Sequence, residues 1–282
     1  MKIAENGEVM YFNKDGGSIG ELVKTGRGIA TVFNGFCGEH DKVFHPIDNE
    51  DYVPGNKEQE YLFAMRAAAK EYTTRQTVGN ALAVRDTDDV PDEVKEFPIA
   101  DEMVELFEEF RKGFDVGTND QAIYRGIFND TLIKSKFNVI QTSVIVADGE
   151  LPVAVSGSFN MELDIEGNLI NDVSNAALST KMKPCFMTVF PQNGRTYCLV
   201  SYLRKDRADY EFLNAINNMD NVFKQTVISN LTAGYVENFV ASPTYWNGLD
   251  SEVRRAYADI FGVSFKKRYV HFLTDKNFNL FP

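Results

Sequence analysis

The strongest constraint on the fold is a run of strand-like segments joined by short turns in the middle of the chain. Residues 139–146 are rich in β-branched side chains. Residues 186–190 and 196–203 flank Pro191-Gln192-Asn193-Gly194, whose Asn-Gly pair is favoured in two-residue hairpin turns. A second turn signal, Glu166-Gly167-Asn168, lies between residues 151–163 and 169–173. Because strands joined by such short turns pair antiparallel, the sequence predicts an antiparallel sheet of four to five strands.

Helical patterns precede this sheet. After a break at Pro54-Gly55, Asn56 and Gln59 have the spacing of a capping box. Apolar residues then recur at helical spacing: Tyr61, Leu62, Met65, Ala68, Ala69 and Tyr72. Arg66 is expected to be exposed beside this stripe. A second helix is expected from Asp101, and Thr118 with Gln121 predicts the start of a third.

Helical patterns also follow the sheet. Residues 209–219 and 222–240 carry apolar side chains at helical spacing, and Pro243 is expected to end the second segment. Asp250 is expected to cap a last helix that runs through Ile260. The order of helices, strands and helices predicts the α+β class, with helices packed on the sheet.

The first 55 residues are expected to form a small β-rich N-terminal element. Glu8 to Phe12 is a plausible strand, Asp15-Gly16-Gly17 has turn chemistry, and residues 19–32 suggest a second, irregular strand. Residues 56–282 would form the α+β body. We expect the two parts to make one compact unit of 282 residues.

Composition excludes several classes of partner. No apolar run is long enough to span a bilayer and no signal segment is present, which predicts a cytoplasmic protein with no membrane partner. The three cysteines are too few for a disulfide framework and fit a reducing compartment. The net charge of −12 disfavours nucleic acid, whose binding requires basic residues. An unknown protein partner remains, and Tyr245, Trp246 and Phe278 are expected either in a homodimer contact or in the core.

Side chains that could bind a metal or take part in catalysis are concentrated between Phe33 and Asp48, in the sequence FNGFCGEHDKVFHPID. Cys37 and His40 have a spacing that lets both reach one metal ion, zinc or another divalent metal, with His45 or Asp41 as a third ligand. The same pair is also consistent with a packed, structural role. A third interpretation is a Cys37 thiolate nucleophile, with His40 and Asp41 as base and polarising group.

Outside this segment, the sequence gives weaker signals for functional residues. Cys185 and Cys198 fall in expected strands and are predicted to be small core residues. Glu237 lies among apolar residues of an expected helix, where it would be exposed or half-buried with a raised pKa. Walker, GxGxxG, HExxH, EF-hand and GxSxG motifs do not occur, which argues against the common nucleotide-binding, zincin and α/β-hydrolase classes.

The segment resembles a widespread, largely uncharacterised family of bacterial proteins with the motif FxGFCxxHDxxxFxPI followed by an acid. The matching residues are Phe33, Gly35, Phe36, Cys37, His40, Asp41, Phe44, Pro46, Ile47 and Asp48. In those relatives a Ser-His segment, sometimes with CxxC, precedes the equivalent of Ile3 to Gly7. Together with CxxHD it resembles a treble-clef, HNH-nuclease-like arrangement. This chain starts at Met1 without that segment, so the resemblance implies only half of the constellation.

Two functional hypotheses follow. In the first, the protein is a bacterial binding or regulatory module, related to stress or phage defence, in which the Cys37–Asp48 motif is mainly structural. In the second, it is a metal-dependent hydrolase resembling a degenerate HNH nuclease, in which Cys37 and His40 support a metal and His40 and Asp41 are catalytic.

Overall fold

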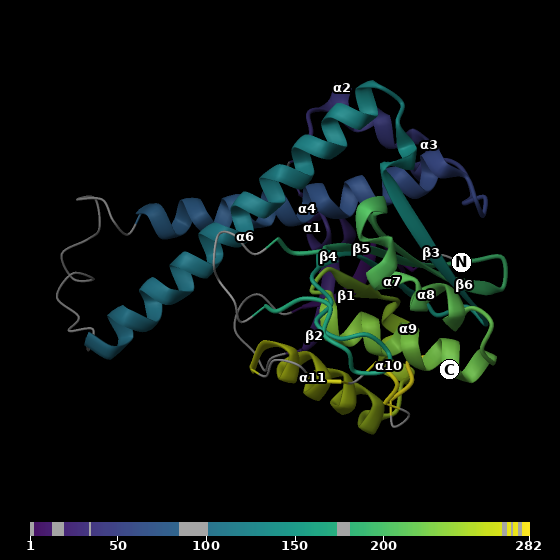
Figure 1. Ribbon diagram of the computed structural model, residues 1–282. Coiled ribbons are helices and arrows are strands. Elements are labelled where there is room, and N and C mark those ends of the chain that lie inside the picture. Colours follow the sequence, from purple (N-terminus) through teal and green to yellow (C-terminus); the bar gives the residue numbers. More distant parts are fainter. Residues whose placement is uncertain are drawn as a thin grey trace.

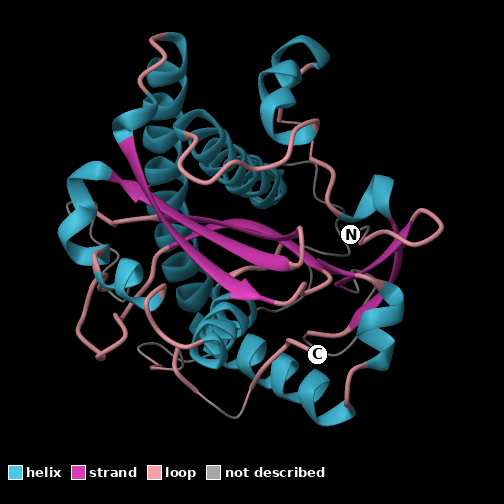
Figure 2. Ribbon diagram, turned by 90° about the vertical axis from the view of Figure 1, so that its right-hand side faces the viewer, coloured by secondary structure: helices cyan, strands magenta, loops and turns pink. Residues whose placement is uncertain are grey.

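The computed structural model describes residues 3–12, 20–33, 35–84, 101–173, 181–266, 270–271, 273–275 and 278–282. It has three layers: an antiparallel sheet lies between one layer formed by two long helices and another formed by shorter helices (Figure 1; Figure 2). The α+β class predicted from the sequence is therefore confirmed.

Seven strands form the sheet within the described residues, in the order β2-β1-β7-β4-β5-β6-β3. Their bounds are β1 Glu8–Phe12, β2 Leu22–Gly26, β3 Ile140–Asp148, β4 Val153–Phe159, β5 Cys185–Gln192, β6 Arg195–Leu203 and β7 Phe239–Ala241. The prediction of four to five strands is wrong in number. It counted neither β7 nor the N-terminal hairpin, which joins the same sheet because β1 pairs with β7 at Met10 and Ala241.

The turns that the sequence predicts most strongly are formed in the structure. Asn193 and Gly194 both have positive φ, 54° and 78°, and join β5 to β6 in the two-residue turn that the Asn-Gly pair predicts. At Glu166-Gly167-Asn168 the turn is also formed, and the Asp164 carboxylate accepts from the backbone N–H groups of residues 166 and 168. Residues 169–173 form no strand beyond one bridge at Leu169. The turn of Asp15-Gly16-Gly17 lies outside the described residues.

Helices α4 Lys57–Val84 and α6 Asp101–Ile133 cover one face of the sheet and extend past its edge (Figure 1). Their core contains Tyr61, Leu62, Met65, Phe128 and the sheet residue Phe186. On the other face lie α7 Arg207–Tyr210, α8 Phe212–Ile216, α9 Asn221–Tyr235, α10 Pro243–Gly248 and α11 Ser251–Lys266. Their core is larger and includes Ile145, Met187, Val200, Leu231, Trp246 and Tyr257.

The structure corrects the predicted helix start at Thr118. Helix α6 is continuous through this residue, and the Thr118 hydroxyl donates to the Phe114 carbonyl one turn earlier, 2.9 Å away, instead of capping a new helix. Packing against α4 accounts for the continuity, since the Arg75 guanidinium lies over the Phe114 ring at 5.8 Å. Gly117 leaves space for Arg75, because a Cβ at that position would lie 2.7 Å from its Nη1.

The structure also corrects the helix expected over residues 222–240. Helix α9 ends at Tyr235, since Val236 has the extended conformation φ −126°, ψ 121°. Phe239 to Ala241 then form β7, which pairs with β4 on one side and with β1 on the other. An apolar run at the end of a helix pattern suits a buried strand equally well, and only the two neighbouring strands decide between them. Pro243 does not end a helix but begins α10.

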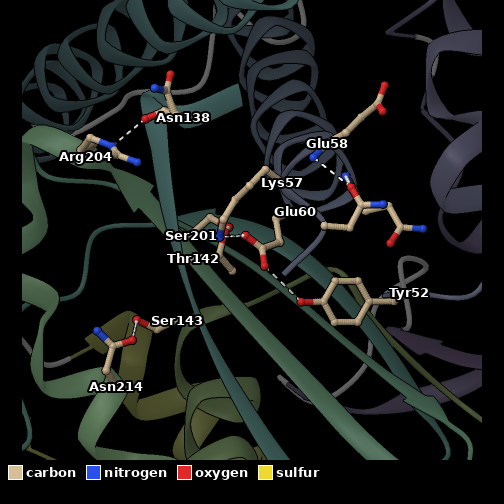
Figure 3. Close-up of polar contacts among 12 residues, drawn as sticks. Tyr52, Lys57, Glu58, Glu60, Asn138, Thr142, Ser143, Ser201, Arg204 and Asn214 are labelled. Carbon is tan, nitrogen blue, oxygen red and sulfur yellow. Dashed lines mark hydrogen bonds and ion pairs between the residues drawn. The ribbon is translucent and has the colours of Figure 1, made fainter. Parts of the chain in front are cut away.

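The start of α4 is held by polar contacts, several of which Figure 3 shows. The side-chain amide oxygen Oδ1 of Asn56 caps the helix by accepting from the N–H groups of Glu58 and Gln59, as predicted. The Gln59 side chain does not complete a capping box. It accepts from Val53 N–H at 2.8 Å. The carboxylate of Glu60, only 3% exposed, lies between the Lys57 ammonium at 2.7 Å and the Tyr52 hydroxyl at 3.3 Å.

The burial of the aromatic residues near the C-terminus decides between the two alternatives predicted for them. Trp246 and Phe278 are buried in the core, which removes them from any dimer contact, and Tyr245 is half-buried against it. The Asp250 carboxylate caps α11 by accepting from Glu252 N–H at 2.8 Å, as predicted. No helix in the described ranges is long and apolar enough to cross a membrane.

Candidate functional site at the Cys37 segment

The Cys37 segment folds into three consecutive helical turns: α2 Gly38–Asp41, η1 Lys42–Phe44 and α3 His45–Asp48. Its last part packs on the body of the protein. Phe44 is fully buried and makes an edge-to-face contact with Phe36, with 5.0 Å between ring centroids.

Arg66 on α4 holds this last part of the segment. Its guanidinium binds both carboxylate oxygens of Asp48, at 2.7 and 2.8 Å, and lies over the Phe44 ring at 4.4 Å. Gln59 adds a hydrogen bond from its Nε2 to the Pro46 carbonyl at 2.9 Å. The expectation that Arg66 is an exposed side chain outside the core stripe is corrected, since it is only 28% exposed and is paired.

The first part of the segment is exposed and carries the chemistry. The Cys37 sulfur lies 3.2 Å from Nδ1 of His40, within hydrogen-bonding distance. The pKa of the Cys37 thiol is lowered from its ordinary value. The main causes are the backbone N–H groups of His40 and Glu39, which face the sulfur, and the His40 side chain adds to the effect. Asp41 and His45 are also exposed.

The metal interpretation requires a complete set of ligands. Cys37 and His40 supply two donors, whereas a catalytic zinc ion needs three protein ligands and a structural one four. Within the described residues, no group of three or more His, Cys, Asp or Glu side chains is arranged to hold a metal ion. Among the described residues, His45 therefore does not complete a set of metal ligands with Cys37 and His40.

A cavity of about 610 Å³ opens beside Cys37 and His40, between the segment and helices α4 and α6. Eight of its seventeen lining residues are apolar, and small-molecule sites combine such apolar residues with polar groups. The apolar residues are Phe36, Val43, Met65, Ala68, Ala69, Phe128, Leu132 and Ile133. We call this cavity the α4–α6 cleft.

The cleft also has a polar lining. Besides Cys37, Glu39 and His40, it contains Tyr72, Thr73 and Gln76 from α4, and Arg125 and Asn129 from α6. The Arg125 guanidinium lies over the Tyr72 ring at 4.8 Å, and Gln76 Nε2 donates to the Tyr72 hydroxyl at 2.8 Å. Among the described carboxylates, none is within ion-pair distance of Arg125. The guanidinium is thus a cation available to a ligand.

Glu237 belongs to a different cluster. It lies after α9 rather than on the helix expected from the sequence, and it is exposed. The pKa of its carboxyl is nevertheless raised, because surrounding protein atoms displace water and because Glu71 repels the charged form, while Arg75 opposes both effects. Arg75 bonds Glu71 at 2.7 Å, so the cluster is a charge network of α4.

Comparison with protein-family models, curated proteins and solved structures finds no match. The likeness of the Cys37 segment to a bacterial family therefore stays a prediction.

The sequence indicated the lining residues at Cys37 and His40 but not the polar ones on α4 and α6. Cys37 and His40 are conspicuous because they are close in sequence. Tyr72, Gln76 and Arg125 are separated from them by tens of residues and look like ordinary helix-surface side chains. Only the packing of α6 beside α4 brings them to the same cavity.

Proposed function

We propose that the protein is a binding or regulatory module whose ligand occupies the α4–α6 cleft. The observation that carries this proposal is the cavity of about 610 Å³, which is lined by both apolar and polar side chains. The ligand would be a small, largely apolar molecule with one anionic group. Apolar surface would be buried on the partly exposed residues Phe36, Val43 and Leu132, and the anion would pair with Arg125.

The contacts of the Cys37 segment support a mainly structural role for the segment and a ligand-binding role for the cleft. Phe44, Asp48 and Arg66 hold the segment on α4, which keeps the cleft wall in place. A role in a bacterial stress or phage-defence system is part of the same proposal and rests on the family resemblance alone. The nuclease alternative has no structural observation in its favour, because the described residues supply two metal donors at Cys37.

Binding of 1-anilinonaphthalene-8-sulfonate tests the proposal, because this probe joins an apolar ring system to one anionic group. We expect saturable fluorescence enhancement with the natively folded protein. Ala69→Trp, which fills the cleft with a large side chain, should abolish the enhancement. Arg125→Gln should weaken binding about fivefold to tenfold through the loss of a charge-assisted contact.

Thr74→Trp is the matched control, because Thr74 is an exposed residue of the same helix outside the cleft lining. It should leave probe binding unchanged. If Ala69→Trp does not fold, Gln76→Trp at the exposed rim serves in its place. Equal binding by wild type and by a folded cleft-filling variant would overturn the proposal.

A further inference from the structure

The three cysteines lie in opposite environments. Cys185 and Cys198 are fully buried in the sheet core, and burial raises the pKa of each thiol to about 12. Both are inert at neutral pH. Cys37 is exposed, has an imidazole nitrogen 3.2 Å from its sulfur, and lines the α4–α6 cleft. Among the cysteines, only Cys37 meets the requirements for a nucleophile.

The imidazole and the cleft are independent observations that both concern Cys37. His40 Nδ1 is placed to take the thiol proton and to stabilise the resulting thiolate. Val43, Ala69 and Leu132 are partly exposed and line the same cavity as Cys37. A molecule that buries an alkyl chain on them can therefore place its other end beside Cys37.

We infer that Cys37 covalently captures an apolar electrophile of the α,β-unsaturated carbonyl class that binds in the α4–α6 cleft. This inference rests on the proposed function, since the cleft must first bind the apolar part of the molecule. The reaction at Cys37 does not require the anionic group that would pair with Arg125. It assigns to the protein a reaction, conjugate addition, and makes the regulatory module a sensor of reactive lipophilic carbonyl compounds.

The reaction needs no group beyond those present. The Cys37 proton moves to His40, and the thiolate electron pair forms a bond to the β-carbon of the alkene. The π electron pair of the alkene moves to the carbonyl side as an enolate, which takes the proton back from His40. The sum is addition of S–H across C=C, with no leaving group, oxidant or reductant.

The test compares but-3-en-2-one and oct-1-en-3-one, two alkyl vinyl ketones with the same electrophilic group. Adducts on the full-length protein are followed by mass spectrometry with peptide mapping. We expect modification at Cys37 and not at Cys185 or Cys198. The eight-carbon ketone should react about tenfold faster than the four-carbon one, since burial of four more methylene groups favours its addition. N-acetylcysteine should show no such preference.

Three variants complete the test. Ala69→Trp should remove the preference for the longer ketone, and Thr74→Trp should keep it. His40→Ala should slow the addition of both ketones at neutral pH and shift the midpoint of the pH–rate profile upward, because the thiolate loses its neighbouring imidazole. Cys37→Ser should abolish the adduct.

Equal rates for the two ketones, or modification that begins at Cys185 or Cys198, would overturn the inference. Failure can be assigned to one of the two proposals. Probe binding that Ala69→Trp removes, together with equal ketone rates, refutes the covalent reaction and leaves the binding function in place. If Ala69→Trp leaves probe binding unchanged and the two ketones also react at equal rates, the cleft is refuted as a ligand site.

Discussion

At the scale of the residue, chemical role follows from surroundings rather than from residue type. Cys37, Cys185 and Cys198 carry the same thiol, but two are buried among sheet side chains and one faces solvent beside His40. Burial penalises the thiolate, whereas backbone N–H groups and an imidazole stabilise it. The prediction that Cys185 and Cys198 are core residues is confirmed.

A metal at Cys37 is tested by elemental analysis of protein purified without an affinity tag or chelator. Because Cys37 and His40 are two donors and His45 does not join them, we expect zinc and other transition metals well below one equivalent per chain. Cys37→Ser and His45→Ala should give the same low values. One equivalent in wild type that both variants lose would instead establish the three-ligand site and justify nuclease assays.

At the scale of the element, the Cys37 segment depends on α4. Its own helical turns have three or four residues each, too short to be stable alone. The Phe44 ring, the Asp48 carboxylate and the Arg66 guanidinium form one continuous contact that attaches the segment to the long helix. The position of Cys37 at the cleft is therefore a consequence of packing seven to eleven residues further along the chain.

The Asp48→Asn variant measures this attachment. Loss of the bidentate pair should lower the free energy of unfolding by about 1 kcal/mol, a modest value because both side chains are partly exposed. Glu39→Gln is the matched control. It breaks the pair of Glu39 with Lys42 in the same segment, where the side chains are 81% and 57% exposed, and should change stability by a few tenths of a kcal/mol at most. Denaturant unfolding that gives equal losses for the two variants would contradict the assignment.

At the scale of the whole molecule, the N-terminal hairpin is joined to the C-terminal part of the chain through β7 and α10. Strand β7 lies between the N-terminal hairpin and β4, so it connects the hairpin to the rest of the sheet. The Glu5 carboxylate reinforces this connection. It accepts from the Ser242 hydroxyl, from the Thr244 hydroxyl at 2.6 Å and from Thr244 N–H at 3.1 Å.

This contact predicts a pH dependence. Hydrogen bonds from Ser242, and then from Thr244, lower the pKa of Glu5 in the folded protein below its ordinary value of 4.5. The stabilisation is therefore complete above pH 4.5 and is lost as the pH falls through the lowered pKa. Glu5→Gln should melt at a lower temperature than wild type at pH 7, and the difference should disappear in acid. Glu8→Gln, at an exposed position of the same hairpin, should show neither effect.

Sequence alone determined the features that neighbouring residues control. The Asn193-Gly194 turn, the β1 strand, the Asn56 and Asp250 caps and the α+β class all follow from local backbone chemistry and periodicity. The same applies to half of the candidate site. Cys37 and His40 are three residues apart, so their proximity needs only a single helical turn.

Tertiary structure decided the features for which local patterns are ambiguous. Residues 239–241 suit a helix or a buried strand, and β1 and β4 select the strand by supplying backbone hydrogen-bond partners on both sides. Helix α6 continues through Thr118 because it packs against α4 there. Arg125 reaches the cleft for the same reason. Its place in the same cavity as Cys37 is fixed by helix packing between distant segments, and the free energy of that packing cannot be read from either segment alone.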